Sequence, residues 1–214
     1  MLEKLKEKIK RINQEKRIKK CKPVADSLMS KDFSIIASSC LSGIIYHDLK
    51  KQFLTPTINL NFRNNDFYYF AANLEKYISA DFDEFIIPDS TYPHGIIKVE
   101  GLPDVVMNFP HDKDFEIVKE NWNRRKNRIN FEYIRVMAVQ QIIDQKVVDL
   151  FEKIPYKKVL FYGINNGAVL TEDCVFNDFL KKETQTTTRS IAGFAGLSTK
   201  RNFDSFDWAT FLKE

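Results

Sequence analysis

The chain has 214 residues, of which 43% are hydrophobic and 29% are charged, enough apolar content for one folded domain rather than a disordered chain. No apolar run approaches the roughly 20 residues that a membrane-spanning helix requires, and no apolar segment follows the N-terminal charges as in a signal peptide. Cys21, Cys40 and Cys174 are widely spaced and form no CxxC pair, which argues against a disulfide framework or a zinc site. We therefore expect a cytoplasmic protein.

The net charge of +4 conceals an asymmetry between the N-terminus and the rest of the chain. Residues 1–22 carry ten Lys and Arg against three Glu, so the remainder is mildly acidic. A narrow apolar stripe at helical spacing comprises Leu2, Leu5, Ile9 and Ile12. The pattern predicts a basic amphipathic helical arm that ends at Pro23. Three interpretations stay open: the arm packs on the domain or on a second copy in a homodimer, it is solvated, or it contacts an anionic membrane surface.

Residues 32–214 read as a single α/β domain that opens with a strand feeding a helix. Residues 33–37 predict a short buried strand, Ser38, Ser39 and Cys40 a tight turn, and Gly43 the opening of a helical run that continues to Leu49. This arrangement gathers several unpaired backbone N–H groups at one point. It is therefore the first place to look for a site.

Strands and helices alternate through the rest of the chain. Further strands are expected at residues 58–60, 85–87, 96–99, 105–109, 131–138 and 158–162, and helices at 64–78, 114–128, 147–151 and 206–212. Asp112 or Asp114 would cap the 114–128 helix, Gly163 would stop the last strand, and residues 181–190 would form an exposed loop. Residues 96–109 suggest a hairpin, so we expect a three-layer α/β/α sandwich with a mostly parallel, mixed sheet.

In such a sheet, ligands bind beyond the carboxyl ends of the strands. That rule selects Ser38, Ser39 and Cys40 after the first strand and His111 after the 105–109 strand. It also selects a wider set of polar positions, namely Asn61–Asn64, Asp112, Gln140, Gln141, Asn165 and Asn166. Backbone donors from Ser39 to Gly43 would form a cradle for an anion. The alternative is a turn that only packs.

Cys40 and His111 are the candidate catalytic residues. Cys40 would begin a helix, where the positive end of the helix dipole favours a thiolate nucleophile. His47 is the histidine nearest in sequence, but it lies almost two turns along the predicted helix. His111, directly after a strand, is the better general base. Each histidine is otherwise a hydrogen-bonded structural residue.

No metal site is predicted, and no cofactor is assigned. The three histidines lack metal-ligand spacing. An Asp-x-Asp pattern occurs at Asp81–Asp83 and again at Asp112–Asp114, so its presence carries little specificity.

The basic end of the 114–128 helix is a candidate substrate-binding element. Trp122, Arg125 and Arg128 share one side of that helix. Arginine forks match phosphate oxygens, and a diphosphate would fit between two of them. The alternative is a structural role in which these arginines pair with carboxylates, because the far end of the helix would lie about 20 Å from the ligand edge.

Several segments together resemble a bacterial domain-of-unknown-function family, number nineteen-nineteen, whose members are labelled exopolysaccharide or capsular polysaccharide biosynthesis proteins. The segments are residues 34–40, 92–95, 109–111, 122–130, 154–157 and 203–208. Relatives read Asn-Asn-Cys-Trp-Gly-Gly where this chain has Ser38-Ser39-Cys40-Leu41-Ser42-Gly43, so the aromatic residue and one glycine of that turn are missing here. The resemblance implies an α/β fold and a setting in cell-surface glycan assembly, with no established catalytic residues.

Residues and resemblance together lead to two functional expectations. The first is a cytoplasmic transferase-like protein that handles a phosphorylated or nucleotide-linked sugar. The second is a non-catalytic accessory or scaffolding protein that binds a partner through its N-terminal helix. Nucleic-acid binding is not expected, because the globular part is net acidic.

Overall fold

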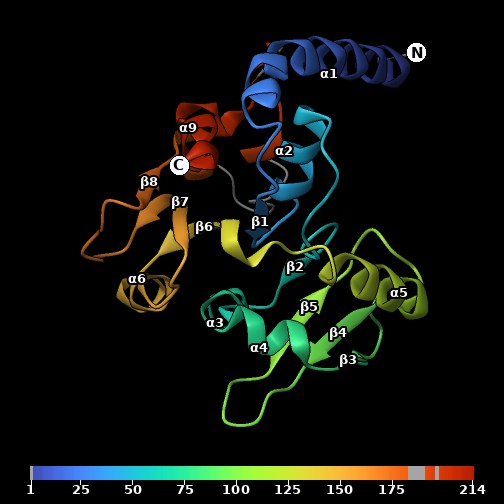
Figure 1. Ribbon diagram of the computed structural model, residues 1–214, viewed down its shortest axis with the longest axis vertical. Helices are drawn as coiled ribbons and strands as arrows, with labels where there is room; N and C mark the ends of the chain where they lie inside the picture. The colour runs from blue at the N-terminus through green and yellow to red at the C-terminus, as the bar shows by residue number, and fades with distance from the viewer. Residues whose placement is uncertain (1, 183–190, 196–197) are drawn as a thin grey trace.

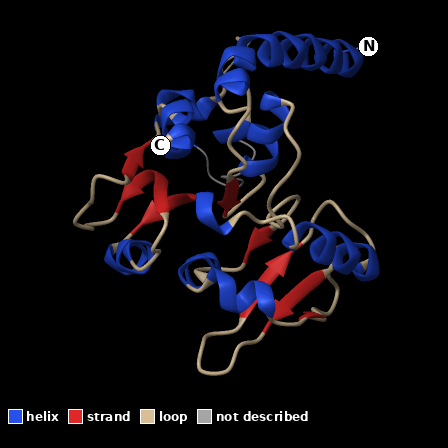
Figure 2. Ribbon diagram, viewed as in Figure 1, coloured by secondary structure: helices blue, strands red, loops and turns tan. Residues whose placement is uncertain are grey.

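The computed structural model describes the backbone of residues 2–182, 191–195 and 198–214, and their side chains except at positions 2–7, 10 and 182. These residues form two four-stranded sheets (Figures 1 and 2). One sheet is parallel, in the order β1 (Ser34–Ala37), β6 (Ile134–Ile143), β7 (Lys157–Asn165), β8 (Cys174–Phe176). The other is antiparallel, in the order β2 (Asn61–Phe62), β5 (Val105–Asn108), β4 (His94–Ile97), β3 (Phe82–Glu84).

Helices flank both sheets. They are α1 (Leu2–Ser27), α2 (Leu41–Leu49), α3 (Asp66–Ala72), α4 (Leu74–Ser79), α5 (Phe115–Lys126), α6 (Gln145–Glu152), α7 (Asp178–Lys182) and α9 (Trp208–Lys213), with 3₁₀ turns at Phe131–Tyr133 and Asn202–Ser205. As predicted, Asp114 caps α5, accepting a hydrogen bond from the Glu116 N–H at 2.8 Å. No described helix combines the length and the apolarity that a bilayer span requires.

The antiparallel sheet is an insertion in the parallel one. β1 pairs directly with β6, from Ser34 opposite Ile134 to Ala37 opposite Met137, although about one hundred positions separate them. The intervening chain builds α2 to α5 and the whole antiparallel sheet. The α/β class is thus as expected, but the three-layer sandwich with one mixed sheet is not confirmed. The predicted hairpin is present, yet its strands pair with β2 and β3 rather than with the parallel sheet.

The parallel sheet is buried on both faces, which explains why its strands are continuously apolar. Side chains alternate between the faces along each strand. On one face Ile35, Ala37 and Met137 pack with residues of α2 and α9. On the other, Ile36 and Val136 join a core that reaches α6 and the antiparallel sheet.

β1 is an edge strand, and side chains cover its outer polar groups. The Tyr46 hydroxyl donates to the Phe33 carbonyl at 2.7 Å and accepts from the Ile35 N–H at 3.2 Å. The Thr57 hydroxyl accepts from the Ala37 N–H at 3.1 Å. These bonds satisfy an edge that would otherwise be open to pairing with another strand.

Helix α1 does not end at Pro23 as predicted, but continues to Ser27. Its C-terminal half packs on α2 and the C-terminal segment, and Arg17, Cys21 and the following Leu28 are buried. Its N-terminal half extends away from the body (Figure 1). Of the predicted apolar stripe, Ile9 is half-buried and Ile12 is 38% exposed.

A buried charge network fastens α1 to the body. The Asp48 carboxylate on α2 accepts hydrogen bonds from the guanidinium groups of Arg17 at 3.0 Å and Arg201 at 2.7 Å, and from the Gln14 amide at 2.9 Å. Arg17 also pairs with Asp204. Burial works to raise the pKa of Asp48, but the hydrogen bonds and charges of these partners outweigh it and hold that pKa below its usual value.

Several strands differ in their bounds from the predictions. β2 and β3 lie a few residues away from the expected 58–60 and 85–87, and β6 runs on through Gln140 and Gln141, which therefore do not follow a strand. Gly163 lies inside β7 and does not end it. A Cβ at Gly163 would come within 2.4 Å of the Leu180 backbone, so this glycine serves a close approach of α7 to the sheet. Most of the predicted 181–190 loop lies outside the described residues.

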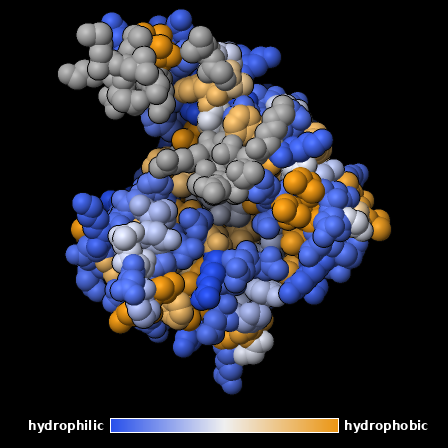
Figure 3. Space-filling model, turned by 180° about the vertical axis from the view of Figure 1, so that it is seen from behind, coloured by the Kyte–Doolittle hydropathy of each residue, from blue (hydrophilic) through white to orange (hydrophobic). Residues whose placement is uncertain are grey.

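Seen from behind, the molecule shows a mostly hydrophilic face on which apolar side chains form separate small groups (Figure 3). Scattered apolar residues of this kind are ordinary on a protein surface. The described residues that are exposed and large include Ile142, Val169 and Phe176, near the end of the parallel sheet.

Candidate functional site

The turn from β1 into α2 is rigidly held. The Ser38 N–H donates to the Met137 carbonyl at 3.2 Å, and the Ser38 hydroxyl accepts from the Val139 N–H at 2.9 Å. Ser38 therefore extends the pairing of β1 with β6 by one residue. Cys40 follows as the N-cap of α2, and its side chain forms no capping hydrogen bond.

A buried threonine segment braces the first turn of α2 from outside the sheet. The Ser42 hydroxyl donates to the Thr57 carbonyl at 2.8 Å, and the hydroxyls of Thr55 and Thr57 are 2.9 Å apart. Gly43 lies against Ile58, whose Cδ1 would be 3.4 Å from a Cβ at that position. The first turn thus presents backbone N–H groups that have no acceptor within the helix, on a support that cannot easily move.

The structure brings together the two predicted catalytic residues. Cys40 Sγ lies 3.9 Å from His111 Nε2, although 71 positions separate them in the sequence. His111 follows β5 of the antiparallel sheet in a turn closed by the hydrogen bond from the Asp112 N–H to the Phe109 carbonyl. His111 is exposed and Cys40 is half-buried, so the pair is accessible from solvent. His47 points elsewhere, with its Nδ1 3.1 Å from Gln14 Nε2.

Arg125 approaches the same turn through Ile58. Its Nη1 donates to the Ile58 carbonyl at 3.3 Å, and the Ile58 side chain contacts Gly43. Burial lowers the pKa of Arg125, with the Arg124 and Arg128 charges acting in the same direction and Asp112 opposing them. Arginine nonetheless stays protonated, so a half-buried positive charge lies beside the first turn of α2.

Neither predicted phosphate-binding arginine is neutralised within the described part of the chain. Arg125 and Arg128 form no ion pair there, and Arg125 bonds instead to the Ile58 carbonyl, so a structural role for Arg125 stays open. Arg128 is half-buried, and its backbone N–H donates to the Arg125 carbonyl at 3.0 Å.

Ser39 is placed differently from the other members of the turn. It is fully buried, and its hydroxyl finds no hydrogen-bond partner among the described residues. A buried hydroxyl without a partner is unusual in folded proteins and calls for a water or ligand atom.

As for metals, no group of three or more His, Cys, Asp or Glu side chains in residues 2–182, 191–195 and 198–214 is arranged to hold an ion.

A second constellation was missed by the sequence reasoning. In the loop before β4, Ser90 Oγ lies 2.7 Å from His94 Nε2, and His94 Nδ1 lies 2.7 Å from Asn108 Oδ1. Asn108 Nδ2 in turn donates to Asn61 Oδ1 at 2.8 Å. The predicted hairpin began at residue 96 and left His94 in the preceding turn; the observed β4 begins at His94, which places it opposite Asn108.

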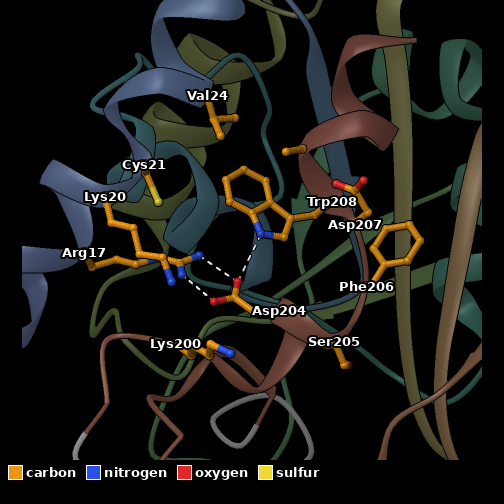
Figure 4. A pocket seen from close by; sticks show the side chains of 11 residues that line it. Arg17, Lys20, Cys21, Val24, Lys200, Asp204, Ser205, Phe206, Asp207 and Trp208 are labelled. Atoms are coloured by element: carbon orange, nitrogen blue, oxygen red, sulfur yellow. Dashed lines mark hydrogen bonds and ion pairs between the residues drawn. The ribbon is translucent and has the colours of Figure 1, made fainter.

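Several cavities lie away from the β1–α2 turn. One, of about 250 Å³, includes Ser90 and His94 in its wall. Another, of about 400 Å³, has Asn177 and Asn202 in its wall. A third, of about 410 Å³, lies between α1 and the C-terminal segment (Figure 4). There the Arg17 guanidinium and the Trp208 indole both point at the Asp204 carboxylate, which accepts from both. Arg17, Trp208 and Asp204 satisfy one another's hydrogen bonds. We therefore interpret this cavity of about 410 Å³ as a packing gap beside the charge network.

Two comparisons with known proteins bear on this site. An uncharacterized protein of Haemophilus influenzae is 24% identical over 186 residues, which cover 86% of each chain. The family model described as a domain of unknown function, DUF1919, matches residues 6–213 and so includes the β1–α2 turn, His111, Arg125 and the Ser90 loop. The chain therefore belongs to the DUF1919 family.

Proposed function

We propose that this protein is a transferase of exopolysaccharide or capsular polysaccharide assembly that binds a phosphorylated or nucleotide-linked sugar at the β1–α2 turn. The observation that carries the proposal is the 3.9 Å approach of Cys40 Sγ to His111 Nε2 at the beginning of α2. A thiol, an imidazole and a helix N-terminus meet there from two different sheets. Such convergence is the usual form of a reactive site in an α/β protein.

The phosphate would be held by fixed positive groups. Free backbone N–H groups of the first turn of α2 favour an anion, because the helix dipole adds to their hydrogen bonds. Arg125 supplies a full positive charge beside Ile58, and it forms no ion pair with a carboxylate among the described residues. Ser39 is fully buried, so its hydroxyl lies beneath the turn and does not contact the phosphate directly.

His111 would act as the general base. It removes the proton from an acceptor hydroxyl as that oxygen bonds to the anomeric carbon and the sugar–phosphate bond breaks. The departing phosphate keeps the bonding electron pair, and Arg125 stabilises its charge. Cys40 positions the imidazole; the alternative role for Cys40 is nucleophile, in which a glycosyl–sulfur bond forms first and the acceptor then displaces it.

Two experiments test the proposal: binding of a nucleoside diphosphate, and then turnover of a nucleotide-sugar. A nucleoside diphosphate at millimolar concentration should raise the melting temperature, since ligand binding to the folded state alone stabilises it. Arg125→Gln should abolish that shift, whereas Lys126→Gln on the same helix should keep it as a charge-matched control. Absence of any shift across nucleoside diphosphates and nucleotide-sugars would refute the proposal.

Turnover then separates the roles of the two catalytic candidates. Release of nucleoside diphosphate from a nucleotide-sugar should fall at least about 100-fold in His111→Asn, the typical contribution of a general base. Cys40→Ser should cost less than His111→Asn if Cys40 only positions the imidazole. An equal or greater loss, with a glycosyl adduct on the wild-type thiol by mass spectrometry, assigns Cys40 the nucleophilic role.

The alternative, a non-catalytic accessory protein, is favoured by the N-terminal half of α1, which extends beyond the body (Figure 1). This segment would bind a second copy or an anionic membrane surface. Its test is deletion of residues 2–11, which leaves Gln14 and Arg17 in the charge network. If the deletion abolishes a dimer seen by light scattering, the segment binds a second copy; if it abolishes co-sedimentation with anionic vesicles, the segment binds a membrane surface. Unchanged behaviour in both assays excludes this accessory role.

A further inference from the structure

The hairpin of β4 and β5 assembles a serine, a histidine and an asparagine in the order of a catalytic triad. His94 begins β4 and Asn108 ends β5, and their positions are paired across the two strands. Ser90 lies four residues before His94, in the loop that leads into β4. All three lie in the inserted segment between β1 and β6, so this site is separate from the β1–α2 turn and does not depend on the function proposed above.

The direction of the hydrogen bonds indicates which ring nitrogen of His94 carries a proton. Asn108 donates through Nδ2 to Asn61 Oδ1, so its own Oδ1 faces His94 and can only accept. His94 Nδ1 must therefore carry a proton, and in the neutral imidazole this leaves the Nε2 lone pair directed at the Ser90 hydroxyl, 2.7 Å away. A neutral imidazole with its base nitrogen on a serine hydroxyl is the arrangement that activates a nucleophile.

The histidine is buried and the serine is accessible. His94 is only 5% exposed, and its ring contacts Tyr92 at 4.8 Å between centroids, so its orientation is held by packing as well as by Asn108. Ser90 is exposed and lines the 250 Å³ cavity together with Lys113. The base is thus held inside the fold while the nucleophile faces a space that holds a small ligand.

The Ser90 hydroxyl has a competing acceptor in the resting state. The Tyr92 carbonyl lies 2.9 Å from Ser90 Oγ, so the single hydroxyl hydrogen has two acceptors within reach. A hydroxyl rotates freely between such acceptors. The shorter contact, to His94, is the one that matters for reaction, and the contact to Tyr92 fixes the position of the oxygen in the turn.

We propose that Ser90 is the nucleophile of an esterase site that accepts small acyl esters of alcohols. Ser90 Oγ attacks the ester carbonyl while its proton passes to His94 Nε2. The ester C–O bond then breaks, the alcohol leaves with that proton, and the acyl group remains on Ser90. Water attacks the acyl-serine, giving its proton to His94 and thence to Ser90, and the carboxylic acid departs.

The cavity supports this class of substrate. Its volume suits a short acyl chain rather than a long one, and Phe85, Lys113 and Phe115 line its wall. A positive charge in the wall stabilises the oxyanion that develops on the carbonyl. The exposure of Ser90 admits the water required to release the acyl group.

The test uses p-nitrophenyl acetate and the full-length protein. We expect p-nitrophenol release with a single acetyl group on the peptide that contains Ser90, found by mass spectrometry. Ser90→Ala should lower the rate at least about 100-fold and remove the adduct. Ser79→Ala is the matched control, because Ser79 is also exposed but bonds only to the Glu75 carbonyl. An acetyl group on other residues with an unchanged rate in Ser90→Ala overturns the proposal.

Asn108 is a positioning residue, and its variants separate catalysis from folding. Asn108→Ala should lower the acetylation rate, and Asn108→Asp should restore it with a shifted pH–rate profile, because a carboxylate also accepts from His94 Nδ1–H. Circular dichroism establishes whether each variant is folded. If folded Asn108→Ala acetylates Ser90 at the wild-type rate, the hydrogen-bonded chain is only a brace for the loop and the proposal fails.

Discussion

Asp48 is the centre of the charge network that holds α1, and Asp48→Ala tests that network most directly. In this variant Arg201 loses both hydrogen bonds to the carboxylate and Arg17 loses one, while both guanidinium groups stay buried. Removing one member of a buried ion pair costs about 3–5 kcal/mol, because the partner charge is left uncompensated. Arg17 keeps Asp204, so we expect a loss of about 4 kcal/mol in the free energy of unfolding, in the middle of that range.

The measurement is urea-induced unfolding followed by far-ultraviolet circular dichroism. The control is Asp26→Ala, which breaks the Lys22–Asp26 pair on α1, where the side chains are 71% and 52% exposed. An exposed i,i+4 pair contributes only about 0.3–0.5 kcal/mol. If Asp48→Ala costs no more than Asp26→Ala, the network does not stabilise the fold and the reasoning is refuted.

The same network predicts how stability depends on pH. The pKa of Asp48 is lower in the folded protein than its unfolded value of about 3.9. Its contribution is therefore fully present above the unfolded pKa and is lost as pH falls through the folded pKa. The difference in unfolding free energy between the wild type and Asp48→Ala should shrink as pH falls from about 5 to about 2. A difference that stays constant over this range would contradict the assignment.

Three further substitutions test the edge strand and the packing of α7, each by urea unfolding. Tyr46→Phe leaves buried polar groups on the outer edge of β1 unpaired and should cost about 1–3 kcal/mol; no measurable cost would show that this edge is satisfied otherwise. Thr57→Val removes the acceptor for the last N–H of β1, with a similar expected cost of about 1–3 kcal/mol, and a neutral effect would argue against the brace. Gly163→Ala forces a Cβ against the Leu180 backbone and should cost at least about 1–3 kcal/mol. Gly167→Ala, whose Cβ meets nothing within 4 Å, should cost about 1 kcal/mol through its positive φ alone; equal costs for the two glycines would refute the close-packing argument.

Local patterns in the sequence were sufficient for several of the individual elements. The β1–α2 unit, the helix capped by Asp114 and the hairpin of β4 and β5 all appear near their predicted positions. Each depends on apolar periodicity, a capping residue or a turn within about a dozen residues, and such signals are fully contained in the segment that they specify. The positions of Cys40 at a helix start and His111 after a strand followed from the same local reasoning.

The pairing of those strands and the packing of those helices were decided only in the tertiary structure. The hairpin could have joined the parallel sheet, but β2 and β3 supply its partners, so a second sheet forms. Helix α1 was predicted as a basic arm. Arg17 is nevertheless buried where α1 packs on the body, because Asp48 and Asp204 compensate its charge. Pairing of this kind depends on which groups are desolvated together, and periodicity carries no information about it.

The same reason separates the predicted from the unpredicted parts of the sites. Cys40 and His111 were chosen individually, but their 3.9 Å approach joins two sheets across 71 positions. Ser90 was not chosen, because an exposed loop serine has no distinguishing pattern until His94 and Asn108 are seen beside it. The sequence alone thus determined many of the secondary-structure elements and the kinds of residue at each site. Packing of the chain around two hydrophobic cores decided which of those residues come into contact.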